Sequence, residues 1–191
     1  MGSDQRIGER FLRAGPAYGG SCFPKDTRAL VDTSKNFNTN LSIVKSVIKS
    51  NDDRKLLLTR KIETILGKNV RNKNITFLGV TFKPNTDDMR EASSLFMIPY
   101  LNNKGAKIRY FDPSGYKKEF EKFKKVKFCK DISAACLKSD LIIIHTEWNE
   151  FKLLNFKKIV KKSKFTVYDM RNIYNPSKMK INGIKYFGIG R

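Results

Sequence analysis

The sequence predicts an α/β protein, with a helical region over residues 1–67 followed by a parallel sheet with helices on both faces over residues 68–191. Two patterns support this division. Apolar residues recur at helical spacing up to Leu66, and short apolar runs alternate with helical stretches from Asn74 onward. With 191 residues, of which 40% are hydrophobic, the chain is long enough for one domain and a smaller accessory element.

The helical region opens with apolar residues at helical spacing over residues 7–12. Residues 15–21 (GPAYGGS) are typical of a turn. Pro24 fits the first turn of a following helix, predicted over residues 25–35, because the amide hydrogen that proline lacks has no partner in a first turn.

A long amphipathic helix is predicted between Leu41 and Leu66, where apolar residues trace one stripe, and Gly67 is suited to end it. The preceding residues offer few apolar partners for this stripe. A helix of that length gains most of its stability by packing its apolar face against something else. We therefore expect a second subunit or another domain to cover it.

Short apolar runs separated by helical stretches indicate a parallel sheet covered on both faces. Sheets of this kind bind ligands at the carboxyl ends of their strands. The expected strands are 75–80, 107–111, 126–128, 141–145, 166–168 and 184–187, and the expected helices between them include 94–102, 133–138 and 156–161.

The chain is strongly basic, with 39 Lys and Arg against 18 Asp and Glu and a net charge of +21. Such a charge fits a polyanionic partner. A coding bias toward lysine, asparagine and isoleucine would give the same composition, and a phosphate-bearing small ligand fits it equally well, so we expect no nucleic-acid partner. No apolar run approaches the ~20 residues that span a bilayer, and the N-terminus resembles no secretory signal. We expect a cytoplasmic protein with no membrane partner.

The three cysteines, Cys22, Cys129 and Cys136, match neither a disulfide framework nor a zinc-binding spacing. The single histidine, His145, ends an apolar run and is expected to make an ordinary hydrogen bond there. No metal site is expected.

The segment around Cys22 concentrates chemistry in a few residues. Glycines at 19 and 20 let a ligand approach the backbone, and Cys22 lies at a predicted helix start, where the helix dipole favours a thiolate. Lys25 adds a positive charge, and Asp26 adds a carboxylate able to orient water or move a proton. This pattern fits covalent catalysis. The alternative is a buried cysteine next to a glycine turn, with Lys25 and Asp26 as surface charges.

The run from Gly15 to Asp26 (GPAYGGSCFPKD) closely resembles the active-site motif of the UDP-glucose and GDP-mannose dehydrogenases. The run from Gly79 to Glu91 (GVTFKPNTDDMRE) resembles a second motif of that family. Three shorter matches follow in the family's order, and together the five cover essentially the whole chain. The wording of the second motif is closer to the UDP-glucose branch. The shorter matches are 112–113, 146–151 and 169–172.

The resemblance implies a central helical dimerisation region carrying the catalytic-cysteine loop over residues 1–67, and a Rossmann-like UDP-binding domain over residues 68–191. It also implies a two-step, NAD-dependent oxidation of UDP-glucose to UDP-glucuronate through a cysteine thiohemiacetal and thioester. Cys22 matches the nucleophile, and Asp26 matches the carboxylate that assists hydrolysis. Lys25 is less clearly assigned.

The resemblance also implies roles in binding. Arg90 matches a residue reaching toward the NAD cofactor, although it could instead pair with Asp87 or Glu91. Arg6 matches an arginine inserted into the substrate site of the neighbouring subunit, which implies a homodimer formed through the long central helix. The residues implied to contact the nucleotide sugar are Arg6, Phe11, Tyr18, Gly19, Phe23, Phe82, Lys83 and Arg171.

One feature of the family has no match here. No strand followed by G-x-G-x-x-G and a helix occurs in the 191 residues, so the N-terminal NAD-binding domain is expected to be absent and the chain alone to be inactive. Two other interpretations remain open: a GDP-mannose or UDP-aminosugar dehydrogenase fragment, and a non-catalytic module that binds nucleotide sugar or nucleic acid.

Overall fold

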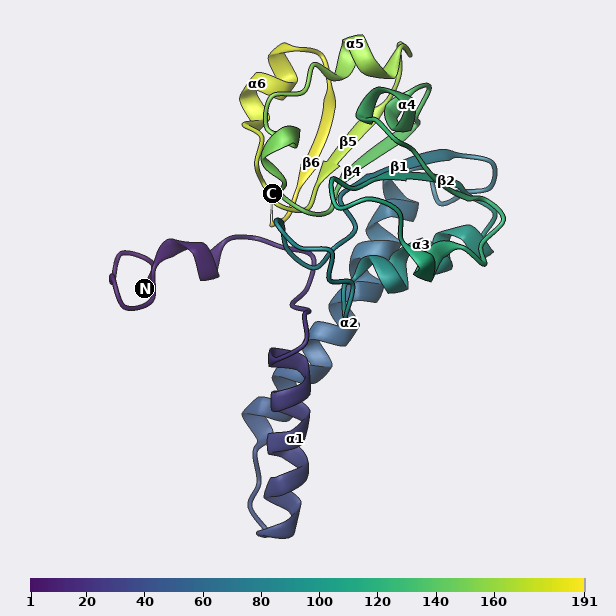
Figure 1. Cartoon of the computed structure of the whole chain (residues 1–191). Coiled ribbons are helices and arrows are strands. Elements are labelled where there is room, and N and C mark those ends of the chain that lie inside the picture. Colours follow the sequence, from purple (N-terminus) through teal and green to yellow (C-terminus); the bar gives the residue numbers. More distant parts are fainter. Residues whose placement is uncertain (191) are drawn as a thin grey trace.

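The computed structural model describes residues 1–190, apart from the side chains of Arg10 and Phe11. Three parts follow one another along the chain (Figure 1). An N-terminal arm with one short 3-10 helix, η1 (Glu9–Leu12), extends away from the rest. A hairpin of two helices comes next and projects from the third part, a sheet covered by helices.

The helical hairpin consists of α1 (Phe23–Asn36) and α2 (Ser42–Ile65). Cys22 precedes the first turn of α1, and Pro24 lies within that turn. Proline is favoured there because the amide hydrogen that it lacks would have no partner within the helix. The long helix expected between Leu41 and Leu66 is confirmed. The first helix starts two residues earlier than predicted, because the turn before it is shorter than the glycine-rich sequence suggests.

The sheet has six parallel strands in the order β3-β2-β1-β4-β5-β6, which confirms the predicted fold class. This is the order of a doubly wound nucleotide-binding fold. Because all strands run in the same direction, their starts form one edge of the sheet, the amino edge, and their ends form the opposite carboxyl edge. The strands are β1 (Asn74–Leu78), β2 (Lys107–Phe111), β3 (Val126–Phe128), β4 (Leu141–Ile144), β5 (Thr166–Asp169) and β6 (Lys185–Gly188).

Helices bury both faces of the sheet. On one face, α3 (Ser94–Asn103) and the last turns of α2 pack over the central strands, with Ile62 and Met97 fully buried there. The other face is covered by α4 (Ile132–Cys136), α5 (Phe156–Val160) and α6 (Pro176–Ile181). Two further 3-10 turns are η2 (Lys118–Phe120) and η3 (Asn149–Phe151). The end of α2 thus anchors the hairpin in the core of the sheet.

The strand order reverses between β1 and β4. The strands after β1 are added on one side of the sheet, as β2 and β3, and those after β4 on the other side, as β5 and β6. Ligands of such folds bind where this reversal opens a crevice at the carboxyl edge. Gly79 follows β1 there with φ +75°, and the position its Cβ would take lies 2.5 Å from the Cβ of Thr146, which follows β4. Glycine therefore permits the close approach of the two loops. Within residues 1–190, no helix is both long and apolar enough to cross a membrane.

Candidate active site at the carboxyl edge

Cys22 is exposed and lies at the amino end of α1. Its carbonyl oxygen accepts a hydrogen bond of 2.8 Å from the amide of Asp26, which closes the first helical turn. The hydroxyl of Ser21 lies 3.6 Å from its sulfur. An accessible sulfur at a helix start fits a nucleophile better than a buried structural cysteine.

Lys25 and Asp26 are exposed on the same first turn, with 3.4 Å between the lysine nitrogen and the carboxylate. The ammonium of Lys25 and the carboxylate of Asp26 are exposed to solvent, within one helical turn of Cys22 in the sequence. Both candidates thus remain free to act on a ligand that approaches this helix start.

The glycine-rich loop before Cys22 is fastened to α2. The side chain of Asn51 accepts a hydrogen bond from the amide of Tyr18 and donates one to its carbonyl oxygen, at 2.9 and 3.2 Å. Arg54 donates to the carbonyl oxygens of Gly15 and Pro16, both at 2.9 Å. Because Asn51 is buried, these bonds are shielded from water and fix the loop firmly.

The same loop packs on the chain that follows β1. The amide of Gly20 donates to the carbonyl oxygen of Arg90 at 2.8 Å. Gly20 has φ +89°, and a Cβ there would lie 2.8 Å from the ring of Phe82. A Cβ at Gly19 would lie 2.6 Å from the carbonyl oxygen of Glu91. The two motifs that the sequence singles out therefore touch.

Glu91 joins three parts of the molecule by charge. Its carboxylate lies 2.9 Å from the guanidinium of Arg28 on α1 and 3.8 Å from the ammonium of Lys55 on α2. The hydrogen bond from Arg28 is the main reason that the pKa of Glu91 lies below its ordinary value. Both helices of the hairpin are thereby tied to the loop after β1, which positions Cys22 at the carboxyl edge.

Sequence reasoning missed Asn51, Arg54, Arg28 and Lys55 as parts of this site. The sequence carries a weak signal of their role. Asn51 and Arg54 are polar residues one helical turn apart, within the amphipathic helix predicted between Leu41 and Leu66. Their partners lie more than 30 residues away, so the local pattern did not show what they hold.

Arg171 follows β5 and bridges the loops of this edge. It donates to the carbonyl oxygens of His145 and Phe82, at 2.8 and 3.0 Å, and its Nε lies 3.0 Å from the carboxylate of Glu147. Its side chain is only 12% exposed. Burial lowers the pKa of Arg171 from its ordinary value, whereas Glu147 opposes that change. The guanidinium is therefore a fixed positive charge within the site.

A hollow of about 330 Å³ opens beside Arg171. Arg13 and Lys152 line it together with Arg171, and Glu147 contributes the one acidic side chain. Three cations around one hollow favour an anionic ligand group there.

Phe82 and Lys83 lie after β1, at the point where the strand order reverses. The ring of Phe82 is partly buried against Gly20, and the ammonium of Lys83 lies 5.3 Å from the centre of that ring. Lys83 itself is exposed. An aromatic ring and a free cation next to a glycine loop can meet a base and a phosphate.

Tyr18 and Phe23 flank Cys22 as an edge-to-face pair, with ring centres 4.8 Å apart. Phe23 is 55% exposed, so its ring is accessible to a ligand at this helix start. The structure thus brings Tyr18, Gly19, Phe23, Phe82 and Lys83 to one side of the molecule.

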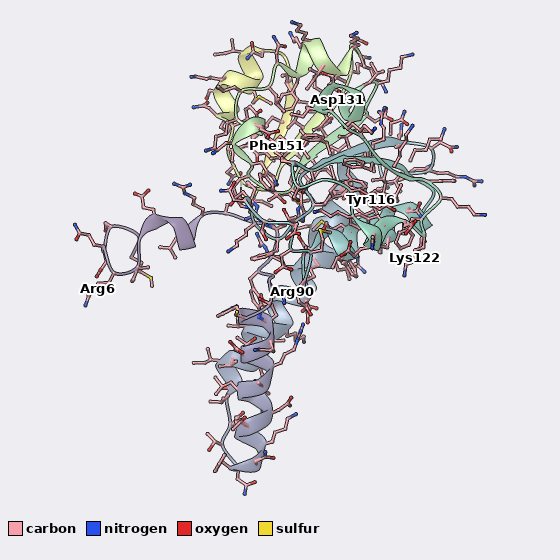
Figure 2. The ribbon with its side chains drawn as sticks, in the orientation of Figure 1. Arg6, Arg90, Tyr116, Lys122, Asp131 and Phe151 are labelled. Carbon is pink, nitrogen blue, oxygen red and sulfur yellow. The ribbon has the colours of Figure 1, made fainter. Side chains whose placement is uncertain are left out.

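Arg90 is exposed and pairs with Asp88 at 2.9 Å, rather than with either acid considered from the sequence. This hydrogen bond is the main reason that the pKa of Arg90 lies above its ordinary value, and the charge of nearby Cys22 adds to it. Arg90 lies at the base of the hairpin (Figure 2).

Arg6 lies apart from the other candidates. It sits at the end of the extended arm, pairs with Asp4 at 2.7 Å, and its side chain is 90% exposed (Figure 2). The side chain of Phe11 lies outside the described residues. Arg6 is therefore not assembled with Cys22 inside this single chain.

The single histidine and the other two cysteines are structural. His145 is fully buried between the hydroxyls of Ser93 and Thr146, at 2.7 and 3.0 Å, and burial lowers its pKa to about 3. Cys129 and Cys136 are buried as well, and burial raises the pKa of Cys136 to about 12. Among the described residues, no group of His, Cys, Asp and Glu side chains could hold a metal ion.

These environments predict selective chemistry at one thiol. Iodoacetamide at neutral pH is expected to label Cys22 roughly a hundredfold faster than the two buried cysteines, because their thiolates are scarce and shielded. Peptide mapping by mass spectrometry gives the rates. Cys22→Ser should remove the fast phase and Cys129→Ser should leave it unchanged, whereas fast labelling of Cys129 or Cys136 would contradict the assignment.

The chain is similar to known proteins over its full length. Residues 76–176 match the UDP-binding domain, and residues 1–53 the central domain, of the UDP-glucose/GDP-mannose dehydrogenase family. UDP-glucose 6-dehydrogenase of Rhizobium meliloti (strain 1021) is 40% identical over 192 residues, covering 100% of this chain and 44% of that protein. The Rickettsia felis enzyme of the same name is 42% identical over 194 residues, covering 100% and 43%.

Solved structures agree in fold. A UDP-glucose dehydrogenase from Pyrobaculum islandicum superposes with a TM-score of 0.80 at 30% identity, covering 98% of this chain and 41% of that one. An NDP-N-acetyl-D-galactosaminuronic acid dehydrogenase from Methanosarcina mazei Go1 gives 0.78 at 26% identity, covering 93% and 39%. The chain spans less than half the length of each of these proteins.

Proposed function

Because this chain belongs to the UDP-glucose/GDP-mannose dehydrogenase family, we propose that it forms the nucleotide-sugar side of a UDP-glucose 6-dehydrogenase active site. The observation that carries the proposal is the contact between the Cys22 loop and the loop after β1, through Gly20, Phe82 and Glu91. That contact places an exposed thiol next to the crevice in which doubly wound folds bind nucleotides.

In the proposed reaction, Cys22 attacks the C6 aldehyde formed by a first oxidation of UDP-glucose. The resulting thiohemiacetal loses a second hydride to become a thioester, and water then releases UDP-glucuronate and the free thiol. NAD, when bound, accepts the hydride in both oxidations. Within this chain, only Arg90 is proposed to reach toward it. Asp26 orients the water that hydrolyses the thioester.

The nucleotide is proposed to lie along the carboxyl edge. Phe82 contacts the uridine side, Lys83 neutralises the diphosphate, and Arg171 holds the sugar or its new carboxylate. The three cations around the hollow next to Arg171 support an anionic ligand at this place. Tyr18, Gly19 and Phe23 contact the sugar nucleotide from the Cys22 side.

A homodimer is part of the proposal. Exposed apolar residues remain along the hairpin, among them Leu30, Ile43 and Val47, and a second copy of the chain would cover them. Phe11 and Arg6 are proposed to contact substrate, with Arg6 reaching the site of the neighbouring subunit, which agrees with its place on an arm extended away from its own body. A cytoplasmic location belongs to the same proposal, as does the boundary between the two regions at residue 67.

Titration calorimetry tests the binding half of this function. UDP and UDP-glucose are expected to bind this chain, and GDP is expected to bind at least tenfold more weakly, which corresponds to about 1.4 kcal/mol. Tighter binding of GDP, or of UDP-N-acetylhexosamines, would support the alternative sugar nucleotides, to which the similarity with the aminosugar enzyme points.

The catalytic half is tested by following NADH formation from UDP-glucose and NAD. No sustained turnover is expected from the 191 residues alone, because they contain no dinucleotide-binding G-x-G-x-x-G segment. Turnover by this chain would disprove the division of labour proposed here, while leaving the UDP-binding prediction intact.

A further inference from the structure

The amino edge of the sheet lies opposite the candidate active site. Almost all of its charged residues are basic. Six chain segments form this edge, each leading into one strand. Together they contain 13 Lys or Arg residues and a single acid, Asp140. The segments are 67–73, 104–107, 123–127, 137–140, 161–165 and 182–185.

These segments form one continuous surface. Backbone hydrogen bonds of 2.8 to 3.0 Å join the segments before neighbouring strands, for example from Lys107 to Lys73, from Asp140 to Asn74 and from Thr166 to Asp140. Six strands at the usual spacing make the edge about 24 Å wide. Asp140 is paired with Lys162, and Lys104 is paired with Glu63 near the end of α2, so two of the 13 cations are neutralised and eleven are not.

The basic composition of the whole chain does not account for this edge. The loops of the carboxyl edge, over residues 79–91, 112–117, 129–131, 145–150 and 170–175, contain 5 basic and 7 acidic residues. A coding bias toward lysine would place similar numbers of lysines at both edges. The asymmetry therefore belongs to the fold, in which parallel strands bring separate lysine-bearing segments together.

Helix dipoles account for only part of the charge. Lys104, Lys138 and Lys161 lie next to the carboxyl ends of α3, α4 and α5, where a cation stabilises the helix. Lys68 follows the end of α2 in the same way, with its amide donating to the carbonyl oxygen of Glu63 at 2.7 Å, and the other nine basic residues have no such role. Of these, Lys124, Lys125 and Lys127 are exposed and form no ion pair among the described residues.

We propose that the amino edge is a peripheral docking surface for an anionic phospholipid membrane. Twelve of its 13 basic residues are lysines, which act as point charges suited to a sheet of lipid phosphates rather than to bidentate base recognition. Ile181, 85% exposed at the end of α6, and Leu137, next to Lys138, add apolar groups that can enter the headgroup layer.

Nucleic acid fits this edge less well. The exposed aromatic rings of the described residues, Phe23, Phe37, Phe96 and Tyr116, lie on the hairpin, at the start of α3 or after β2, away from the amino edge. The rings on the amino edge, Phe123 and Phe165, are half-buried, which disfavours stacking with bases. The expectation of no membrane partner rested on the lack of a spanning helix, and surface docking requires none. The active site on the opposite edge would then face away from the lipid.

Vesicle co-sedimentation tests this proposal. The chain is expected to bind vesicles that contain phosphatidylcholine and phosphatidylglycerol, and not to bind vesicles of phosphatidylcholine alone. Added salt is expected to release the bound chain. The triple variant Lys124→Gln, Lys125→Gln, Lys127→Gln should lower the partition coefficient roughly a hundredfold. A matched triple variant on the hairpin, Lys35→Gln, Lys45→Gln, Lys49→Gln, removes the same charge and should bind like the parent chain.

A further variant separates lipid from other polyanions. Ile181→Ser is expected to weaken vesicle binding several-fold and to leave binding of random duplex DNA unchanged. Equal losses in the two triple variants would overturn the proposal. So would binding to DNA that exceeds binding to vesicles at the same salt concentration. Melting curves by circular dichroism confirm that each variant is folded.

Discussion

Replacing Arg171 by alanine is expected to lower the free energy of unfolding by about 3 kcal/mol, the usual cost of removing one partner of a buried ion pair. The change leaves Glu147, 26% exposed, without its counter-ion, and it leaves the carbonyl oxygens of His145 and Phe82 without their donor. Urea unfolding followed by circular dichroism measures the loss. UDP binding, measured by calorimetry, should fall below detection.

A double variant separates folding from binding. Removing both charges, with Arg171→Leu and Glu147→Leu, should recover much of the stability, because no unpaired buried charge remains. It should not recover UDP binding, since the fixed cation is gone. Unchanged UDP affinity in either variant would remove Arg171 from the proposed site, and unchanged stability of Arg171→Ala would remove it as a joint between loops.

Replacing Gly79 by alanine is expected to cost about 3 kcal/mol of stability, from the left-handed backbone and from overpacking. The added Cβ would lie 2.5 Å from the Cβ of Thr146 and 2.9 Å from its hydroxyl oxygen. Thr146 cannot move freely, because its hydroxyl donates to the carbonyl oxygen of Thr81 at 2.6 Å. The loop bearing Phe82 and Lys83 must therefore shift, and UDP affinity should fall as well.

Gly67 supplies the matched control. It has φ +80°, yet a Cβ there would have no heavy atom within 4 Å. Gly67→Ala should therefore cost only about 1 kcal/mol, from the backbone alone. Thermal unfolding of the two variants compares the costs directly. Equal losses would show that the contact with Thr146 contributes nothing and that backbone conformation is the whole effect.

Local sequence patterns are enough to predict the secondary-structure elements of this protein and its candidate nucleophile. Helical and strand periodicities depend on neighbours a few residues apart, so the long helix up to Leu66 and all six strands could be predicted to within about two residues at each end. The run around Cys22 carried its own signal, because glycines, a cysteine and a carboxylate are adjacent in sequence.

The contacts between these elements follow from the three-dimensional fold and from no local pattern. Arg171 reaches Phe82 across 89 residues, and Arg28 reaches Glu91 across 63, so no local pattern could name these partners. The lysines of the amino edge likewise looked like uniform composition until the strand order placed their segments side by side. The physical reason is the same in each case: hydrogen bonds and ion pairs depend on distance in space, which parallel strands and a helical hairpin set between residues that the sequence keeps far apart.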